Sequence, residues 1–277
     1  MQKMICGGNP MRYSNLHNHT VFSDGKHTPE ENILSAIEKN MLSLGFSDHS
    51  FTACDPSYCM GEERYDAYKQ EINRLKQKYA HQIPVYLGME LDYYSTPVDR
   101  SEYDYILASV HYIIQDGVCY PIDHSPQQQK DCADQVFGGD YIAMAKGYFD
   151  MLCEHVERVD PTFVGHFDVI TKFSLMPEED EHYRKVAREA LARVIAACPY
   201  IEMNTGAISR GWRKTPYPCS YLLDTVKQQG GHILLSADSH HKDNLTYHFD
   251  ESVQLLREAG IDHIAVFNGK TFDHVAI

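Results

Sequence analysis

Positive charge is scarce in this sequence, and long hydrophobic runs are missing. Its 277 residues include 25 Lys and Arg against 39 Asp and Glu, so the formal net charge is −14. A broad nucleic-acid surface needs clustered Lys and Arg, and we therefore expect no nucleic-acid partner. An anionic substrate is still possible, because bound metal ions can reverse the charge locally. Residues 1–11 lack the apolar stretch of a secretory signal, and no run is long enough to span a membrane. We expect a cytoplasmic protein with no membrane partner.

The cysteines lack the spacing of a structural metal site. None of the eight stands in a Cys-x-x-Cys motif, which argues against a zinc knuckle. Several, such as Cys153 and Cys198, lie in apolar runs. We expect them to be small core residues of a protein in a reducing compartment.

Short apolar runs alternate with amphipathic segments along the chain, which predicts alternating strands and helices. Strands are expected at 13–17, 42–48, 84–91, 105–111, 163–166, 200–204 and 233–237, with an eighth run at 264–267. Helices are expected at 29–40, 62–79, 141–159, 178–197, 221–229 and 251–259. Such alternation implies a parallel sheet, and seven or eight units imply a barrel. We expect one domain over residues 1–277.

One segment, at about 112–140, breaks this alternation. It is rich in Gln, Asp and Gly and is too long for a plain connection. We expect either a functional loop or a disordered one.

His17-Asn18-His19 stands where the first predicted strand ends. Alternate residues of a strand face the same way, so both imidazoles can reach one cation. With 16 histidines in the chain, about one His-x-His pair is expected by chance. The motif alone is therefore a weak indication of a metal site.

Further potential ligands follow the later predicted strands. Any one of them could be an ordinary hydrogen-bonded residue at the end of a strand. However, six of the seven predicted strands end in His, Asp or Glu, and coincidence does not explain that well. In a barrel these ends converge on one face. The mixture of His and carboxylates suits Zn, Fe or Mn, and more ligands are present than one ion needs. The strand-end groups are Asp48-His49, Glu90, His111, His166 with Asp168, Glu202 with Asn204, and Asp238-Ser239-His240. By contrast, His155 and His182 lie in helical patterns and are expected to face solvent.

In their order along the chain, these residues resemble the motifs of the PHP family (polymerase and histidinol phosphatase). The motifs that carry the resemblance are Leu16-His17-Asn18-His19-Thr20, Phe46-Ser47-Asp48-His49, Gly88-Met89-Glu90, Ser109-Val110-His111 and Ser236-Ala237-Asp238-Ser239-His240. Gly165-His166-Phe167-Asp168 and Asn204-Thr205-Gly206 resemble the histidinol-phosphate phosphatase branch. The resemblance runs from about Asn15 to Lys242. It implies an α/β fold, a distorted TIM-like (β/α)7 barrel, with a centre of three divalent ions.

The resemblance also implies how the ligands divide among the ions. The first ion would be held by His17, His19, Glu90 and Asp238. Glu90 would bridge to a second ion, which His111 and His166 complete. Asp24, His49 and His240 would hold the third. Many family members have His where this chain has Asp24, a difference that bears on metal preference.

Together these features predict a phosphoric monoester hydrolase acting on a small phosphorylated substrate. The leading reading is L-histidinol-phosphate phosphatase, in which a hydroxide bridging the metal ions attacks phosphorus. Asp238 would orient or deprotonate the water, and Asp168 would protonate the leaving oxygen or act behind the ligands. Substrate-binding candidates are Lys172, Arg210, Arg213 and His27, although such loop charges are often merely solvated.

Four other functions compete with the phosphatase prediction. The nearest alternative is a PHP-family phosphoesterase for another small phosphate ester or a nucleotide. A polymerase-associated nuclease would need a basic groove, and an amidohydrolase usually has a mid-chain ligating Lys that this sequence lacks. A non-catalytic binding module would be expected to lose ligands, yet all nine positions are filled. The sequence does not indicate an oligomeric state.

Overall fold

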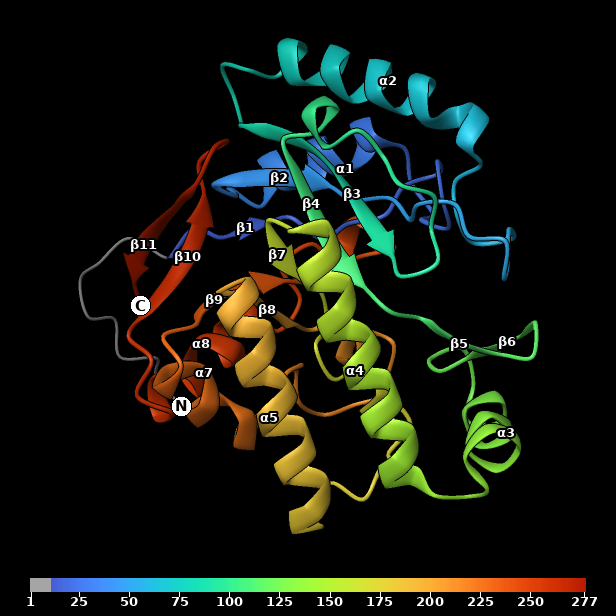
Figure 1. Cartoon of the computed structure of the whole chain (residues 1–277). Helices are drawn as coiled ribbons and strands as arrows, with labels where there is room; N and C mark the ends of the chain where they lie inside the picture. Colours follow the sequence, from blue (N-terminus) through green and yellow to red (C-terminus); the bar gives the residue numbers. More distant parts are fainter. Residues whose placement is uncertain (1–10) are drawn as a thin grey trace.

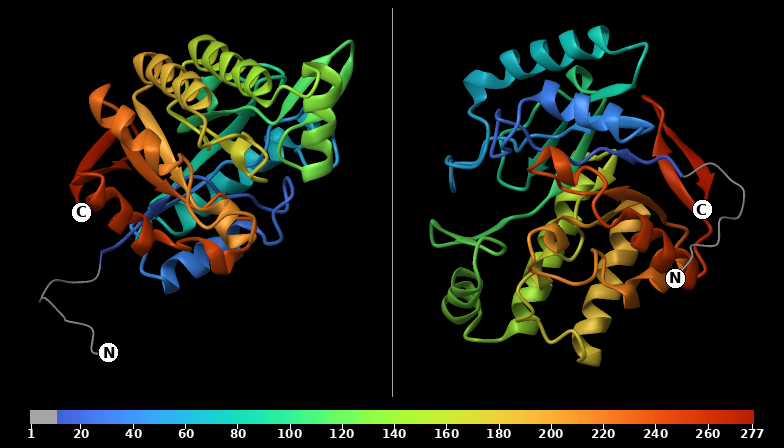
Figure 2. Two further views of the ribbon diagram at one scale, coloured as in Figure 1. Left: turned by 90° about the horizontal axis from the view of Figure 1, so that it is seen from below. Right: turned by 180° about the vertical axis from the view of Figure 1, so that it is seen from behind.

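Seven parallel strands form the centre of the computed structural model, which describes residues 11–277. In sheet order they are β1 (Ser14–Asn15), β2 (Ser43–Phe46), β3 (Val85–Asp92), β4 (Tyr105–Ser109), β7 (Phe163–Val164), β8 (Tyr200–Asn204) and β9 (His232–Ser236). Just beyond β1 and β9, the His19 amide donates to the Ser239 carbonyl and the Ser239 amide to the His17 carbonyl. These bonds close the sheet, which confirms the distorted (β/α)7 barrel (Figures 1 and 2).

The six predicted helices are all present and differ from the prediction only near their ends. They are α1 (Pro29–Glu38), α2 (Tyr65–Lys78), α4 (Tyr141–Val159), α5 (Glu181–Ala197), α7 (Leu223–Gln228) and α8 (Phe249–Glu258). Side-chain caps explain several starts, because Thr28 and Glu31 form a capping box and Asp140 and Asp180 accept from the first free amides. No helix within residues 11–277 is both long and apolar enough to cross a membrane.

Short elements fill the connections between these helices and strands. They are the four-residue α6 (Gly206–Ser209) and the 3-10 helices η1 (Glu62–Arg64), η2 (Arg100–Glu102), η3 (Val169–Thr171), η4 (Ser220–Leu222) and η5 (Lys242–Asn244).

The segment 112–140 is not the long loop that we predicted. It folds into β5 (Tyr112–Gln115), β6 (Val118–Pro121) and α3 (Pro126–Phe137), which project to one side of the barrel (Figure 1). Asp116 and Gly117 have φ values of 52° and 78° at the hairpin turn, a conformation that the Asp-Gly pair adopts readily. Ser125 caps α3, and Pro126 stands at its start. The Asp-Gly turn and the Ser-Pro helix start are both local sequence signals. The polar composition of the segment led us to predict a loop in spite of them.

The amino-terminal end of the barrel is filled by aromatic side chains. The Tyr105 ring lies inside the barrel against Gly45 and Gly88, where a Cβ atom on either glycine would collide with it. The predicted eighth strand is β10 (His263–Phe267), which pairs antiparallel with β11 (Phe272–Ala276) outside the seven-stranded sheet. This hairpin contributes Phe267 and Phe272 to the same buried cluster.

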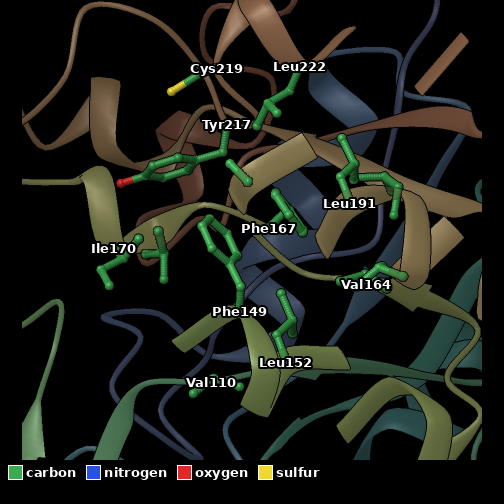
Figure 3. Packing of buried hydrophobic residues seen from close by; sticks show 14 of the residues in the cluster. Val110, Phe149, Leu152, Val164, Phe167, Ile170, Leu191, Tyr217, Cys219 and Leu222 are labelled. Atoms are coloured by element: carbon green, nitrogen blue, oxygen red, sulfur yellow. The ribbon is translucent and has the colours of Figure 1, made fainter. Parts of the chain in front are cut away.

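A second cluster lies between the barrel and its outer helices. Phe149 of α4 stacks on Phe167 with ring centroids 4.9 Å apart (Figure 3). Leu152 and Leu191 join the two helices to the same core. Burying such a side chain contributes roughly 1.5–3 kcal/mol. Phe167 directly follows His166, so this packing fixes the backbone at one of the predicted ligands.

The cysteines only partly match the expectation. Cys54 and Cys119 form a disulfide, with Cα atoms 5.6 Å apart across a sequence separation of 65. This bond does not fit the expectation of a protein in a reducing compartment, and nothing in the sequence indicated the pairing, which the fold brings within bonding range. The described cysteines Cys59, Cys132, Cys153, Cys198 and Cys219 are unpaired and buried. Cys6 lies outside the described residues.

Candidate metal centre

The carboxyl ends of the strands bring all nine predicted metal ligands together. Their ligand atoms fall into four overlapping groups, and within each group the atoms lie within 4.8 Å of one another. The groups are His19/Asp24/His49/His240, His17/Glu90/His166, His17/His19/Asp238 and His49/Glu90/His111. Within the set Asp24 is exposed and His240 is half-buried, while the other seven are buried.

Glu90 lies at the middle of this arrangement. Its Oε2 is 2.8 Å from His49 Nδ1 and 3.2 Å from His17 Nε2. Its Oε1 is 3.1 Å from His166 Nε2 and 3.5 Å from His111 Nε2. The two oxygens thus face different histidines, which is the arrangement required of a carboxylate that bridges two ions.

Asp24 joins the outer end of the cluster. Its Oδ2 is 3.0 Å from His240 Nε2, and its Oδ1 is 3.7 Å from His49 Nε2. His19 lies against both of these histidines, with ring centroids 4.2 Å from His49 and 4.3 Å from His240. Asp24 can therefore supply an oxygen ligand beside His49 and His240.

Several buried ligand atoms have no hydrogen-bond partner. They are His17 Nε2, both ring nitrogens of His19 and His166 Nδ1. Buried polar atoms are nearly always partnered, so unpartnered ring nitrogens of His17 and His19 beside the carboxylates of Glu90 and Asp238 suit the binding of a cation. Imidazole and carboxylate donors suit zinc, iron and manganese. The residues present therefore fit divalent metal ions.

The charges of the cluster also favour cations. Burial alone would raise the pKa of Glu90, but His17, His49 and His111 hold that pKa well below its usual range. Burial opposes protonation of His111, yet its hydrogen bond to Asp92 and the charge of Glu90 raise the pKa of His111 to about 9. Burial and the neighbouring His49 and His240 lower the pKa of His19 to about 3. The carboxylates are thus ionised, and some histidines keep protons that a metal ion must displace.

Two carboxylates behind the ligands were not predicted as site residues. Glu202 Oε2 is 2.9 Å from His17 Nδ1, and Asp92 Oδ2 is 3.1 Å from His111 Nδ1. Each leaves Nε2 of its histidine directed at Glu90. A carboxylate in this position fixes the ring and its tautomer. The sequence places Glu202 at the end of a predicted strand, but it does not show which carboxylate lies behind which imidazole.

A cavity of about 470 Å³ opens above the ligands. Two of the predicted substrate-binding residues, Lys172 and Arg210, line it. Arg210 Nη2 donates to Asp238 Oδ2 at 2.8 Å, and its Nη1 donates to the Asp238 carbonyl at 3.2 Å. Lys172 Nζ donates to the carbonyl and to Oδ2 of Asp123, at 2.6 and 3.1 Å. Asp238 itself has a φ of 44°, a conformation uncommon outside glycine that places its carboxylate at the cavity wall.

The structure places three other predicted residues away from this cavity lining. Arg213 donates to the Thr171 carbonyl at 2.9 Å and lies 3.7 Å from Glu178, with only 8% of its side chain exposed. Asp168 is fully buried, and its Oδ2 accepts from the Cys219 amide at 2.9 Å. His27 is half-buried and packs edge-on against His241 at 4.3 Å.

The cavity also contains residues that we did not predict. Tyr58 follows the predicted ligand His49 in sequence, and Tyr112, Asp123 and His124 belong to the segment expected to be a loop. Burial alone would raise the pKa of Asp123, but Lys172 and the nearby histidines hold it below its usual range. Asp123 is therefore a carboxylate at neutral pH. Its position could not be found without the β5–β6 hairpin.

Comparison with known proteins agrees with this geometry. Residues 15–206 match the PHP domain. The chain belongs to the PHP family. A Schizosaccharomyces pombe protein named "Probable histidinol-phosphatase" is 32% identical over 265 residues, covering 86% of this chain and 83% of that protein. A Deinococcus radiodurans PHP relative with the same name is 26% identical over 265 residues, covering 88% and 92% respectively.

A solved structure extends the likeness of this PHP chain to the fold. It is histidinol phosphate phosphatase from Lactococcus lactis, crystallised with zinc, L-histidinol and phosphate. The TM-score is 0.69 at 23% identity, with 95% of this chain and 99% of that chain covered. The likeness supports the barrel fold.

Proposed function

We propose that this PHP protein hydrolyses L-histidinol phosphate to L-histidinol and phosphate, using divalent metal ions held by the nine ligands. One observation carries the proposal: Arg210, which holds the ligand Asp238, and the ionised Asp123 line the same cavity. Histidinol phosphate has an anionic phosphate and a cationic amine, so it matches both charges. The names of the two curated relatives support the same substrate.

The ligand cluster is the proposed phosphate end of the site. We propose three ions, with zinc, iron and manganese as the candidates that these donors suit. When bound, such ions supply an activated water and neutralise phosphate charge. The Arg210 guanidinium adds donors that match phosphate oxygens in shape and charge. This positive end lies within a protein whose net charge is −14.

Asp238 is proposed to orient the attacking water. Burial alone would raise the pKa of its carboxyl, but Arg210 and His17 hold that pKa well below its usual range. Its Oδ2 is held by Arg210, and its Oδ1 lies 3.1 Å from His19 Nε2. A carboxylate with so low a pKa accepts hydrogen bonds readily but is a weak base. Orientation therefore fits Asp238 better than proton abstraction.

The position of Asp168 favours a supporting role over leaving-group protonation. Burial raises the pKa of its carboxyl, which would suit an acid. However, its Oδ2 is engaged by the Cys219 amide, and it lies outside the cavity lining. We propose that Asp168 ties the segment after His166 to the segment around Cys219.

Asp123 is the proposed site for the amine of the substrate. Lys172 engages its Oδ2 and carbonyl oxygen, which holds the carboxylate in place at the cavity wall. A hydrogen bond between an amine and a charged group contributes about 1.5–3 kcal/mol. Loss of the Asp123 charge should therefore reduce kcat/KM for an amine-bearing ester by about 10- to 100-fold. An aryl phosphate that lacks an amine should be affected much less.

The test is a phosphate-release panel on purified protein supplied separately with zinc, iron and manganese. It compares L-histidinol phosphate, p-nitrophenyl phosphate, a nucleoside monophosphate and a phosphodiester. The expected result is a clear preference for L-histidinol phosphate, reduced in Asp123→Asn but not in Asp134→Asn, which alters an exposed pair with Lys130. A rate for L-histidinol phosphate no better than for p-nitrophenyl phosphate would refute the substrate. Preference for the nucleotide would support the alternative reading.

A further inference from the structure

Three rings form one wall of the substrate cavity, which we call the aromatic wall: Tyr58, Tyr112 and His124. The Tyr58 and Tyr112 rings are nearly parallel, with centroids 6.2 Å apart. The His124 ring meets them edge-on at 5.8 and 6.3 Å. Tyr112 is almost fully buried, whereas Tyr58 is half-buried and His124 is exposed. The latter two therefore have ring surface free for a ligand.

The wall begins directly beside the metal ligands. The Tyr58 ring centroid is 4.8 Å from that of His49 and 6.3 Å from that of His111. Asp123, the proposed amine site, immediately precedes His124 in the chain. In a short ester, the phosphate would lie at the metal ligands and the amine at Asp123. The remaining substituent of the ester would then lie against these rings.

Two separate segments of the chain supply the wall, and a covalent bond joins them. Tyr58 comes from the loop that follows β2, whereas Tyr112 and His124 begin and follow the β5–β6 hairpin. The Cys54–Cys119 disulfide links that loop to β6. The hairpin projects from the barrel (Figure 1), and this bond is a direct covalent link between it and the loop. The disulfide therefore keeps the two halves of the wall in one arrangement before substrate binds.

We propose that the aromatic wall binds the planar ring of the substrate and that the Cys54–Cys119 disulfide preorganises it. This inference rests on the proposed function, since it assigns the third part of the same substrate. Flat aromatic faces favour stacking or edge-on contact with another flat ring. The wall selects for phosphate esters that carry a planar ring and against open-chain amino-alkyl phosphates of similar charge.

The test measures selectivity rather than activity alone. The kcat/KM ratio for L-histidinol phosphate over phosphoethanolamine, which has the amine and phosphate but no ring, is determined for Tyr58→Leu, Tyr58→Phe and Tyr120→Leu. Tyr120 lies on β6 beside Cys119, bonds to Gln135, and is outside the cavity lining. We expect a roughly tenfold lower ratio in Tyr58→Leu, mostly through KM, and an unchanged ratio in the other two variants.

Equal losses for both substrates in Tyr58→Leu would overturn the proposal, because they would show a merely structural role. An unchanged ratio in that variant would overturn it as well. If the wild-type protein does not prefer L-histidinol phosphate, the proposed function fails instead. The wall is then judged by whether Tyr58→Leu loses p-nitrophenyl phosphate hydrolysis more than phosphoethanolamine hydrolysis.

The disulfide is tested in the same assay. A dithiol reductant supplies two electrons and two protons, which convert Cys54–Cys119 into two thiols while the reductant is oxidised to its own disulfide. Reduction should lower the ratio in the wild type to that of the Cys54→Ser/Cys119→Ser double variant, which the reductant should leave unchanged. An unchanged ratio in wild-type protein whose bond is shown open by mass spectrometry would contradict preorganisation.

Discussion

The Glu202 carboxylate lies 2.9 Å from His17 Nδ1, and both side chains are completely buried. The same carboxylate accepts from Ser236 Oγ and from the His166 amide, each at 2.5 Å. Glu202 is therefore positioned by two neighbours and in turn fixes the His17 ring. With the proton on Nδ1, Nε2 is free to bind a cation.

Replacing Glu202 by Gln should weaken metal binding. The amide can donate to Nδ1, which would move the imidazole proton to Nε2 and block the ligand position. Outer-shell changes of this kind typically cost about 10- to 100-fold in metal affinity. Zinc competition against a chromophoric chelator measures the affinity. Glu258→Gln, an exposed change on α8, is the control, and equal zinc affinity in both variants would contradict the assignment.

Replacing Arg210 by Ala should impair catalysis more than folding. Arg210 lines the cavity and holds Asp238, so both phosphate binding and orientation of the water depend on it. We expect kcat/KM to fall by about 10- to 1,000-fold, with KM raised. Steady-state kinetics at saturating metal checks this. Unchanged KM and kcat would remove Arg210 from the site.

Replacing Arg213 by Met should instead affect stability. Its buried guanidinium contacts Thr171 and Glu178, and its loss leaves buried acceptors without a partner. Because 25% of the Glu178 side chain is exposed, we expect a loss of about 1–3 kcal/mol, mainly from the buried acceptors left without a donor. Urea unfolding should show that loss, while kcat/KM per folded molecule stays near the wild-type value. A selective rise in KM without destabilisation would restore the substrate-binding role predicted from the sequence.

Metal uptake should depend on pH through His111. Its pKa is raised to about 9 in the metal-free chain, so below that pH an ion must displace a proton. Affinity should therefore rise from pH 6.5 to pH 9 and then level off. The proton itself stabilises the metal-free fold below the usual histidine pKa, an effect that is lost as the pH rises through 9. Asp92→Asn removes the hydrogen-bonded charge, so its affinity profile should be flatter, and identical profiles would refute this cause.

The ligands could be predicted because their positions follow from local rules. Eight of the nine stand near the end of a strand or within four residues after it, and parallel strands in a barrel must bring those ends together. Asp24, nine residues beyond β1, was expected only from the resemblance to the PHP family. Glu90 lies near the end of β3 and His166 lies two residues after β7, so both are placed at the same end of the barrel. The alternation of apolar and amphipathic segments predicted the barrel and the six outer helices. The motifs at the strand ends carried the resemblance to the PHP family.

The substrate cavity could not be predicted in the same way. Asp123 and His124 reach it only because the β5–β6 hairpin turns back, and Tyr58 depends on how its loop packs. The sequence does not distinguish Arg210 from Arg213 as substrate-binding candidates. In the structure the Arg210 side chain lines the cavity, whereas the Arg213 side chain is buried. His155 was expected to face solvent but is fully buried, donating to the Leu91 carbonyl at 2.8 Å. The prediction for His182 is confirmed, since its side chain is exposed.

The aromatic filling of the barrel around Tyr105, Phe267 and Phe272 has a kinetic consequence. Because that end is packed solid, substrate enters and both products leave through the cavity mouth at the other end. In the proposed reaction, phosphate occupies the deepest position, behind the alcohol that it was attached to. The alcohol must then depart first and phosphate last, so inorganic phosphate should inhibit competitively against the ester, and its escape sets an upper limit on turnover.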